Sequence, residues 1–231
     1  MIPSIIDYLK STNRLQILLV LASSTVFGLL LLSVRVFWTE QTSFIFLIWN
    51  IFLALIPLGV SLLLAIKVNS KKLSPFIFWF FVGLWLLFFP NAPYILTDLF
   101  HLKMRDFPFW YDLVLLLIFA WTGTLIGFLS LLIIHDIFTV KYGKVPGWII
   151  SFCAIFLGSF GIYLGRYLRW NSWDMLTNPL TLAEDIWVRI FNPFQHPTTI
   201  GVTFLFTILL SLMYASLLTF NRKIEIEKEV E

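Results

Sequence analysis

Six long apolar runs constrain this chain more than any other feature of its sequence. A helix that crosses a bilayer needs about 20 predominantly apolar residues. Runs of that kind lie at residues 15–37, 44–66, 75–96, 112–134, 147–168 and 200–220. Only 13% of the residues are charged, whereas a soluble domain has about 25%. The sequence therefore predicts an all-α, polytopic membrane protein with about six transmembrane helices.

The rest of the chain offers little material for a second domain. We expect residues 1–231 to form a single transmembrane domain, with a short amphipathic segment at 1–14 and a charged tail at 221–231. One cysteine, Cys153, excludes a disulfide framework. The net charge of +3 is small and comes from loops and the tail, so nucleic acid is not an expected partner.

Lysine and arginine residues predict the orientation, because they are retained on the cytoplasmic side of a membrane. The N-terminal segment, the loops after the second and fourth spans and the tail hold ten of the 16 basic residues. The opposite side holds the other six. We therefore expect both termini in the cytoplasm.

The third span ends in an unusual stretch, FPNAPYILTDLFH at residues 89–101. Pro90 and Pro93 break a helix, because proline lacks a backbone donor and clashes with the preceding turn. The side chains that then share one face of a helix are Asn91, Tyr94, Asp98 and His101. We expect a third helix broken at Pro90–Pro93 that leads into this polar stripe, a pattern by which transporters build binding sites. The alternative is a span that ends at Pro90, with the stripe facing water.

A second polar stretch, GRYLRWNSWD at residues 165–174, falls on the same predicted side of the membrane. Arginine inside a membrane normally pairs with a carboxylate or lines a cavity. We expect Arg166 to pair with Asp98 or Asp112, and Arg169 to lie nearer the surface. The guanidinium that is not in this pair would then recognise an anionic ligand. The alternative is that the two arginine side chains extend to the lipid headgroups. The candidate ligand-binding residues are therefore Asn50, Asn91, Tyr94, Asp98, His101, Asp112, Arg166, Arg169, Asn171 and Asp174.

Asp98 and His101 also have the spacing of an acid/base pair, which makes them the candidate catalytic residues. With His196 they would offer two imidazoles and a carboxylate, a set that can bind zinc or iron. Asp-x-x-His is nevertheless a very weak metal signature, so we expect no metal and no cofactor.

Residues 179–193 form a further local unit between two prolines. Apolar side chains fall on one side of this segment, with Glu184, Asp185 and Arg189 away from them. This pattern is typical of an amphipathic helix in the membrane interface, here on the outer leaflet. The helix either covers the polar site or packs against lipid.

Four motifs resemble those of a known family. They are WN (49–50), PNAPYILTDLFHL (90–102), WYDLVLL (110–116) and GRYLRWNSWD (165–174). They are similar to the motifs of a bacterial integral-membrane family designated domain of unknown function 1361. The resemblance covers most of the chain outside the N-terminal segment and the tail. It implies a multi-pass protein of the bacterial cytoplasmic membrane, and it implies no activity.

Three functions are open on these observations. The first is a permease or substrate-binding subunit that accepts a small polar or anionic ligand from outside. The second is an intramembrane enzyme that acts on a lipid-linked substrate through Asp98 and His101. The third is a non-catalytic assembly protein with a membrane-protein partner. Membrane lipids are the expected surroundings in all three.

Overall fold

The computed structural model describes residues 5–69, 73–102 and 108–230, with the backbone alone at residues 69 and 220–230. Within these ranges all regular secondary structure is helical. The stretches long and apolar enough to cross a membrane are Leu15–Thr39, Phe46–Val68, Pro75–His101, Phe109–Tyr142, Lys144–Tyr167 and Pro197–Thr219. The predicted all-α fold with six candidate spans is confirmed. The chain forms two compact units, Met1–Ile150 and Ser151–Glu231, which are described separately.

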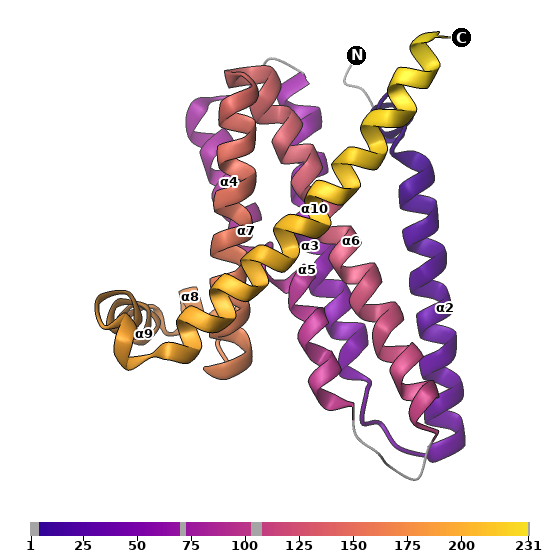
Figure 1. Ribbon diagram of the computed structural model, residues 1–231, viewed down its shortest axis with the longest axis vertical. Helices are drawn as coiled ribbons and strands as arrows, with labels where there is room; N and C mark the ends of the chain where they lie inside the picture. Colours follow the sequence, from indigo (N-terminus) through magenta and orange to yellow (C-terminus); the bar gives the residue numbers. More distant parts are fainter. Residues whose placement is uncertain (1–4, 70–72, 103–107, 231) are drawn as a thin grey trace. The chain divides into compact units, whose positions relative to one another are not determined.

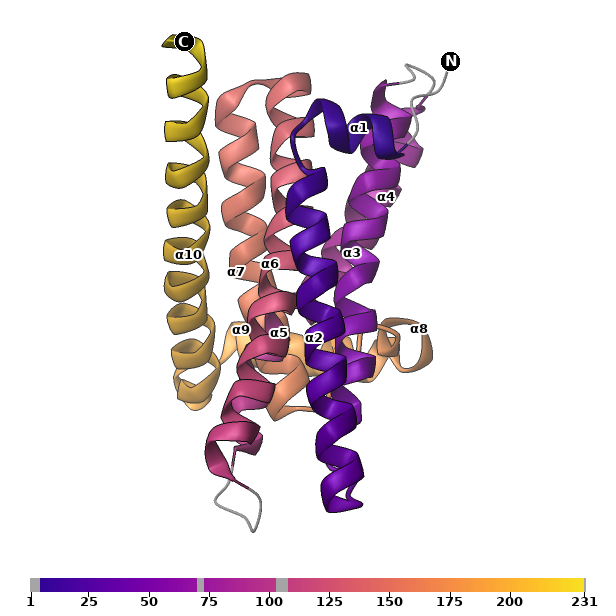
Figure 2. The ribbon, with the colours of Figure 1, turned by 90° about the vertical axis from the view of Figure 1, so that its right-hand side faces the viewer.

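The first unit is built around one long helix. Its elements are α1 (Ile5–Ser11), α2 (Leu15–Thr39), α3 (Phe46–Asn69), α4 (Pro75–Phe88), α5 (Asn91–Tyr94), the 3-10 helix η1 (Ile95–His101), α6 (Phe109–Tyr142) and the start of α7 (Lys144–Tyr167). The helices α2, α3, α5 and η1 all pack against α6, and α2, α3 and α6 run side by side (Figures 1 and 2). Much of α6 is therefore buried.

The two ends of the first unit differ in composition. At the N-terminal end, Arg14 donates hydrogen bonds to the Tyr8 hydroxyl at 2.9 Å and to the Asp136 carboxylate, which fixes α1 beside α2 and α6. At the other end lie the end of α2, the beginning of α3, η1 and the beginning of α6 (Figure 1). We call this second region the η1 end. The η1 end contains the polar residues Asp98 and His101 of the stretch at 89–101.

The third span is interrupted where the prolines predict it. Helix α4 ends at Phe88, α5 makes a single turn, and the chain then tightens into the 3-10 helix η1. In a 3-10 helix residues three apart are aligned, so Ile95, Asp98 and His101 share one side. Tyr94 precedes this row by one residue, about a third of a turn away. The prediction that Tyr94 shares a face with Asp98 and His101 was made for an α-helix, and it is wrong because residues 95–101 form a 3-10 helix.

The interrupted segment lies close to α6 because two glycines leave room for it. A Cβ atom at Gly127 would lie 2.8 Å from the Ala92 Cβ, and one at Gly123 would lie 3.1 Å from the Ala92 carbonyl oxygen. Both distances are shorter than ordinary van der Waals contact. Gly123 and Gly127 form the small-xxx-small pattern by which membrane helices approach closely, so the position of α5 depends on α6.

The second unit contains the rest of α7, then α8 (Asp174–Thr177), α9 (Pro179–Phe191), the 3-10 helix η2 (Pro193–Gln195) and α10 (Pro197–Val230). Helix α9 matches the amphipathic helix predicted at 179–193. Its Leu180, Trp187 and Ile190 side chains are exposed, which suits a helix in the membrane interface; its place on the outer leaflet stays a prediction. The backbone of α10 continues to Val230, whereas the side chains of the predicted tail at 221–231 lie outside the described part.

Candidate functional site

A buried carboxylate lies at the η1 end of the first unit. The Asp98 side chain is only 2% exposed, and its Oδ2 accepts a hydrogen bond of 2.7 Å from Nδ2 of Asn50 in α3. A buried charge is costly unless it is hydrogen-bonded or paired, so this bond stabilises the contact between η1 and α3. The sequence placed Asn50 and Asp98 on the same side of the membrane, and the structure brings them into direct contact.

His101 is the accessible neighbour of Asp98. Its side chain is 43% exposed, and its Nδ1 lies 4.0 Å from Asp98 Oδ1 and 3.2 Å from the Asp98 carbonyl oxygen. Because a carbonyl oxygen can only accept, the shorter contact requires the hydrogen to be on Nδ1. Nε2 is then the ring nitrogen left to meet a ligand or a proton. The Phe46 ring, 5.0 Å away between centroids, packs against the imidazole.

A second buried carboxylate at this end, Asp112, pairs with Arg35, which lies inside the expected span at 15–37 and is not among the candidate site residues. Arg35 in α2 donates from Nε to Asp112 Oδ1 at 2.6 Å and from Nη2 to Oδ2 at 3.2 Å. The two side chains are 1% and 2% exposed. The guanidinium carbon also lies 4.2 Å from the centroid of the buried Phe44 ring. The sequence contains a signal for this pair, because a charged residue within a membrane span usually has a specific role.

The Arg35–Asp112 pair attaches α2 to the beginning of α6. The neighbouring Tyr111 hydroxyl donates to the Leu31 carbonyl oxygen at 2.8 Å, which adds a second polar link between the same helices. Both Asp112 oxygens bind Arg35, so this carboxylate has a structural role in the first unit. The expected pairing with Arg166, which belongs to the second unit, stays a prediction.

The Asn91 side chain stabilises the backbone where helix α4 ends. Its Nδ2 donates to the Phe88 carbonyl oxygen at 2.9 Å, one of the acceptors left without an intrahelical partner where α4 ends. Tyr94 is half-buried, and its carbonyl oxygen accepts from the Thr97 hydroxyl at 2.6 Å. These bonds stabilise the interrupted backbone, while ligand binding by Asn91 and Tyr94 stays a prediction.

In the second unit, Arg169 lies in the turn that follows the end of α7 at Tyr167. It has a left-handed backbone, with φ at 62°, a conformation that side-chain-bearing residues seldom adopt. The following amide, of Trp170, bonds the Leu164 carbonyl oxygen at 3.1 Å. Arg169 therefore has a conformational role in the turn in addition to any contact with a ligand or with headgroups.

Asn171 and Asp174 bind each other across this turn. Asp174 Oδ2 accepts from the Asn171 backbone amide at 2.7 Å and from its Nδ2 at 3.3 Å, and Oδ1 accepts from the Thr177 hydroxyl at 3.0 Å. These bonds, that of the Asn171 amide above all, lower the pKa of Asp174 below its usual value. Both residues thus shape the loop, and their contact with a ligand stays a prediction.

Asp185 of α9 is a further organising residue of the second unit. Its Oδ2 accepts from Trp170 Nε1 at 2.7 Å, and its Oδ1 accepts from Arg189 Nη1 at 2.8 Å. This carboxylate therefore attaches α9 to the turn after α7. Among residues 5–69, 73–102 and 108–230, no three His, Cys, Asp or Glu side chains are grouped so that they could hold a metal ion.

Six candidate spans and a cluster of polar side chains at the η1 end define a multi-spanning membrane protein. Residues 49–213 match the model of the family described as "Protein of unknown function (DUF1361)", and the chain belongs to that family. The resemblance inferred from the four motifs is thereby confirmed. No curated protein and no solved structure matches the chain.

Proposed function

We propose that the protein binds a small polar or anionic ligand at the η1 end of its first unit, from the outer side of the membrane. The observation that carries this proposal is the contrast between His101, 43% exposed, and Asp98 beside it, 2% exposed. The exposed His101 imidazole, held beside the buried Asp98, can contact a ligand from a fixed position. Protonated it attracts an anion, and neutral it accepts a hydrogen bond at Nε2.

The distribution of basic residues supports the outward orientation of this end. Ten of the 16 lysines and arginines belong to the segments assigned to the cytoplasmic side. One of the six on the other side, Arg35, is buried in its pair with Asp112. Removing it from a comparison of loop charges leaves ten against five, which strengthens the expected bias.

A second function, acid/base chemistry on a lipid-linked substrate, is favoured by the distance of 4.0 Å between His101 Nδ1 and Asp98 Oδ1. A carboxylate and an imidazole this close together are the two kinds of side chain that general acid/base catalysis most often uses. This function predicts turnover of a membrane lipid that Asp98→Asn and His101→Ala both abolish. Incubation with a bacterial lipid extract, followed by mass spectrometry of the lipids, tests it.

Native mass spectrometry of the purified protein tests ligand binding directly. We expect the wild type to carry a co-purifying small molecule, and His101→Ala to lose most of it. The matched control is His196→Ala, which removes a half-buried histidine from the turn before α10 in the second unit and should leave the adduct in place. Equal adducts in both variants, or none in the wild type, would refute the proposed site.

A further inference from the structure

Two lysines at the N-terminal end of the first unit converge on neighbouring aromatic rings. Lys67 lies near the end of α3, and its Nζ is 5.8 Å from the centroid of the Phe81 ring. Lys141 lies near the end of α6, and its Nζ is 5.0 Å from the Phe78 centroid and 5.3 Å from the Tyr142 centroid. Phe78 and Phe81 are three residues apart on α4, so their side chains are neighbours on that helix. Two helices thus bring their ammonium groups to one side of a third.

The aromatic rings hold the lysine side chains without neutralising their charge. A cation over a ring face is attracted by the ring quadrupole, and the lysine stem packs along apolar surface. Both lysines are exposed, so each ammonium group can donate to a further acceptor. The Phe78 ring is itself packed, with its centroid 5.7 Å from that of Phe138. Positioning the lysines in advance lowers the entropy that is lost when an anion binds.

The N-terminal end of the first unit has an excess of positive charge. Its described part contains two acidic side chains, Asp7 and Asp136, and Asp136 is bound by Arg14. Within the described residues, no carboxylate is paired with Lys141. The basic side chains described at this end are Lys10, Arg14, Lys67, Lys141 and Lys144. This end therefore attracts anions.

The two lysines lie at the depth of the lipid headgroups. Lys67 is the next-to-last residue of the candidate span Phe46–Val68, and Lys141 is the next-to-last residue of Phe109–Tyr142. Trp79, which follows Phe78 on α4, is 53% exposed. Exposed tryptophan is typical of the boundary between acyl chains and headgroups. Phosphate groups of the membrane are the anions found at this depth.

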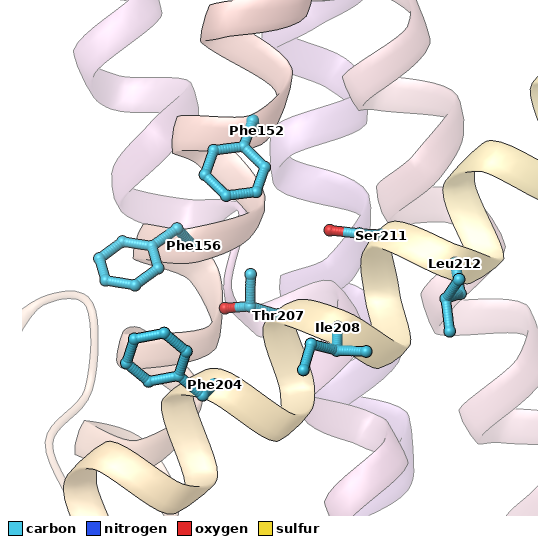
Figure 3. A pocket seen from close by; sticks show the side chains of 7 residues that line it. All are labelled: Phe152, Phe156, Phe204, Thr207, Ile208, Ser211 and Leu212. Carbon is cyan, nitrogen blue, oxygen red and sulfur yellow. The ribbon is translucent and has the colours of Figure 1, made fainter.

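We propose that Lys67 and Lys141 form a binding site for the headgroup phosphate of an anionic phospholipid. An anionic lipid carries a net charge that both ammonium groups attract, whereas a zwitterionic lipid balances its phosphate with a cation of its own. The groove between α7 and α10 in the second unit offers no such selection, because no charged side chain lines it (Figure 3). The lysine site is at the opposite end of the first unit from the η1 end (Figures 1 and 2), so it is independent of the ligand proposed there.

Native mass spectrometry of the delipidated, full-length protein tests the lysine site. The probes are phosphatidylglycerol, phosphatidylcholine and inorganic phosphate, each added to the protein in a neutral detergent. Phosphatidylglycerol should bind several-fold more tightly than phosphatidylcholine. Lys67→Gln and Lys141→Gln should each lower the affinity for phosphatidylglycerol about fivefold, the factor that corresponds to roughly 1 kcal/mol for one basic residue near an anionic surface. Lys141→Arg keeps the charge and should retain the binding.

The matched control is Lys144→Gln, which removes the same charge from the first residue of α7 at the same end of the unit. It should leave the affinity for phosphatidylglycerol unchanged. An equal loss in this control would mean that overall charge alone attracts the lipid, and it would overturn the proposal. Equal affinity of the wild type for the two lipids, or displacement of phosphatidylglycerol by equimolar inorganic phosphate, would overturn it as well. These last two results come from the wild type, so they do not depend on how the variants fold.

Discussion

Replacing one member of the Arg35–Asp112 pair should destabilise the first unit far more than replacing both. The variants are Arg35→Met and Asp112→Leu, alone and together, because both replacements are apolar and of similar length. Breaking a buried ion pair by removing one partner typically costs about 3–5 kcal/mol, whereas an apolar replacement of the whole pair is often neutral or stabilising. We therefore expect the double variant to be more stable than Asp112→Leu.

The structure supports a value in the upper part of that range for Asp112→Leu. The two side chains are 1% and 2% exposed, so water cannot replace the lost partner. A stranded carboxyl can take up a proton, but a guanidinium stays charged at any ordinary pH. Asp112→Leu should consequently cost more than Arg35→Met. The Phe44 ring, with its cation–π contact of about 0.5–2 kcal/mol, compensates only part of the loss.

Unfolding by SDS in mixed micelles, followed by tryptophan fluorescence, measures these free energies. The control cycle uses Arg189 and Asp185, which form an ion pair within α9 at 2.8 Å, with side chains 12% and 32% exposed. A coupling energy of at most about 1 kcal/mol is typical of such partly exposed pairs. Additive effects for Arg35 and Asp112, or a larger loss from Arg35→Met than from Asp112→Leu, would refute the reasoning.

Two further predictions concern the glycine contact and the loop after α7. Gly127→Ala should lower the free energy of unfolding by about 1–3 kcal/mol, because its Cβ would lie 2.8 Å from that of Ala92. Gly83→Ala, with open space around its Cβ, should instead stabilise by up to about 1 kcal/mol; equal effects in SDS unfolding would contradict the close contact. The hydrogen bonds that lower the pKa of Asp174 in the folded protein stabilise it above the unfolded-state pKa, and this stabilisation is lost as the pH falls through the folded-state pKa. Asp174→Asn should therefore cost stability at neutral pH and progressively less in acid, and a pH-independent difference in melting temperature would contradict this.

The membrane spans could be predicted because length and hydrophobicity are local properties of the sequence. Their ends were harder to place. The fourth span was expected at 112–134, whereas α6 extends from Phe109 to Tyr142. The additional turns include Asp136, which binds Arg14, and an apolar criterion excludes such a residue even where the helix continues.

The candidate site could be predicted in part. Topology alone placed Asn50 and Asp98 on one side of the membrane, although 48 residues separate them. Arg35 was counted with the six basic residues of the outer side, although it lies inside the expected span at 15–37, and its pairing with Asp112 was therefore missed. The depth of a charge within a span would have been the better guide.

The 3-10 winding of η1 could not be read from its own residues. Its surroundings include a part of α6, some thirty residues further along the chain, where Gly123 and Gly127 leave room for Ala92 and Ile95. An α-helical wheel drawn on residues 91–101 consequently placed Tyr94 in line with His101. The glycine pair itself was a readable signal, since the small-xxx-small pattern is typical of close helix packing in membranes.

The opening of His101 to the outside is tested most directly by single-cysteine labelling with a membrane-impermeant maleimide in a Cys153→Ala background. His101→Cys should react in intact cells, because this side chain is 43% exposed at the end assigned to the outer face. Ser74→Cys, at the exposed beginning of α4, should react only after the membrane is permeabilised. The reverse pattern, or a cysteine at position 101 that reacts under neither condition, would contradict an outward-facing site at the η1 end.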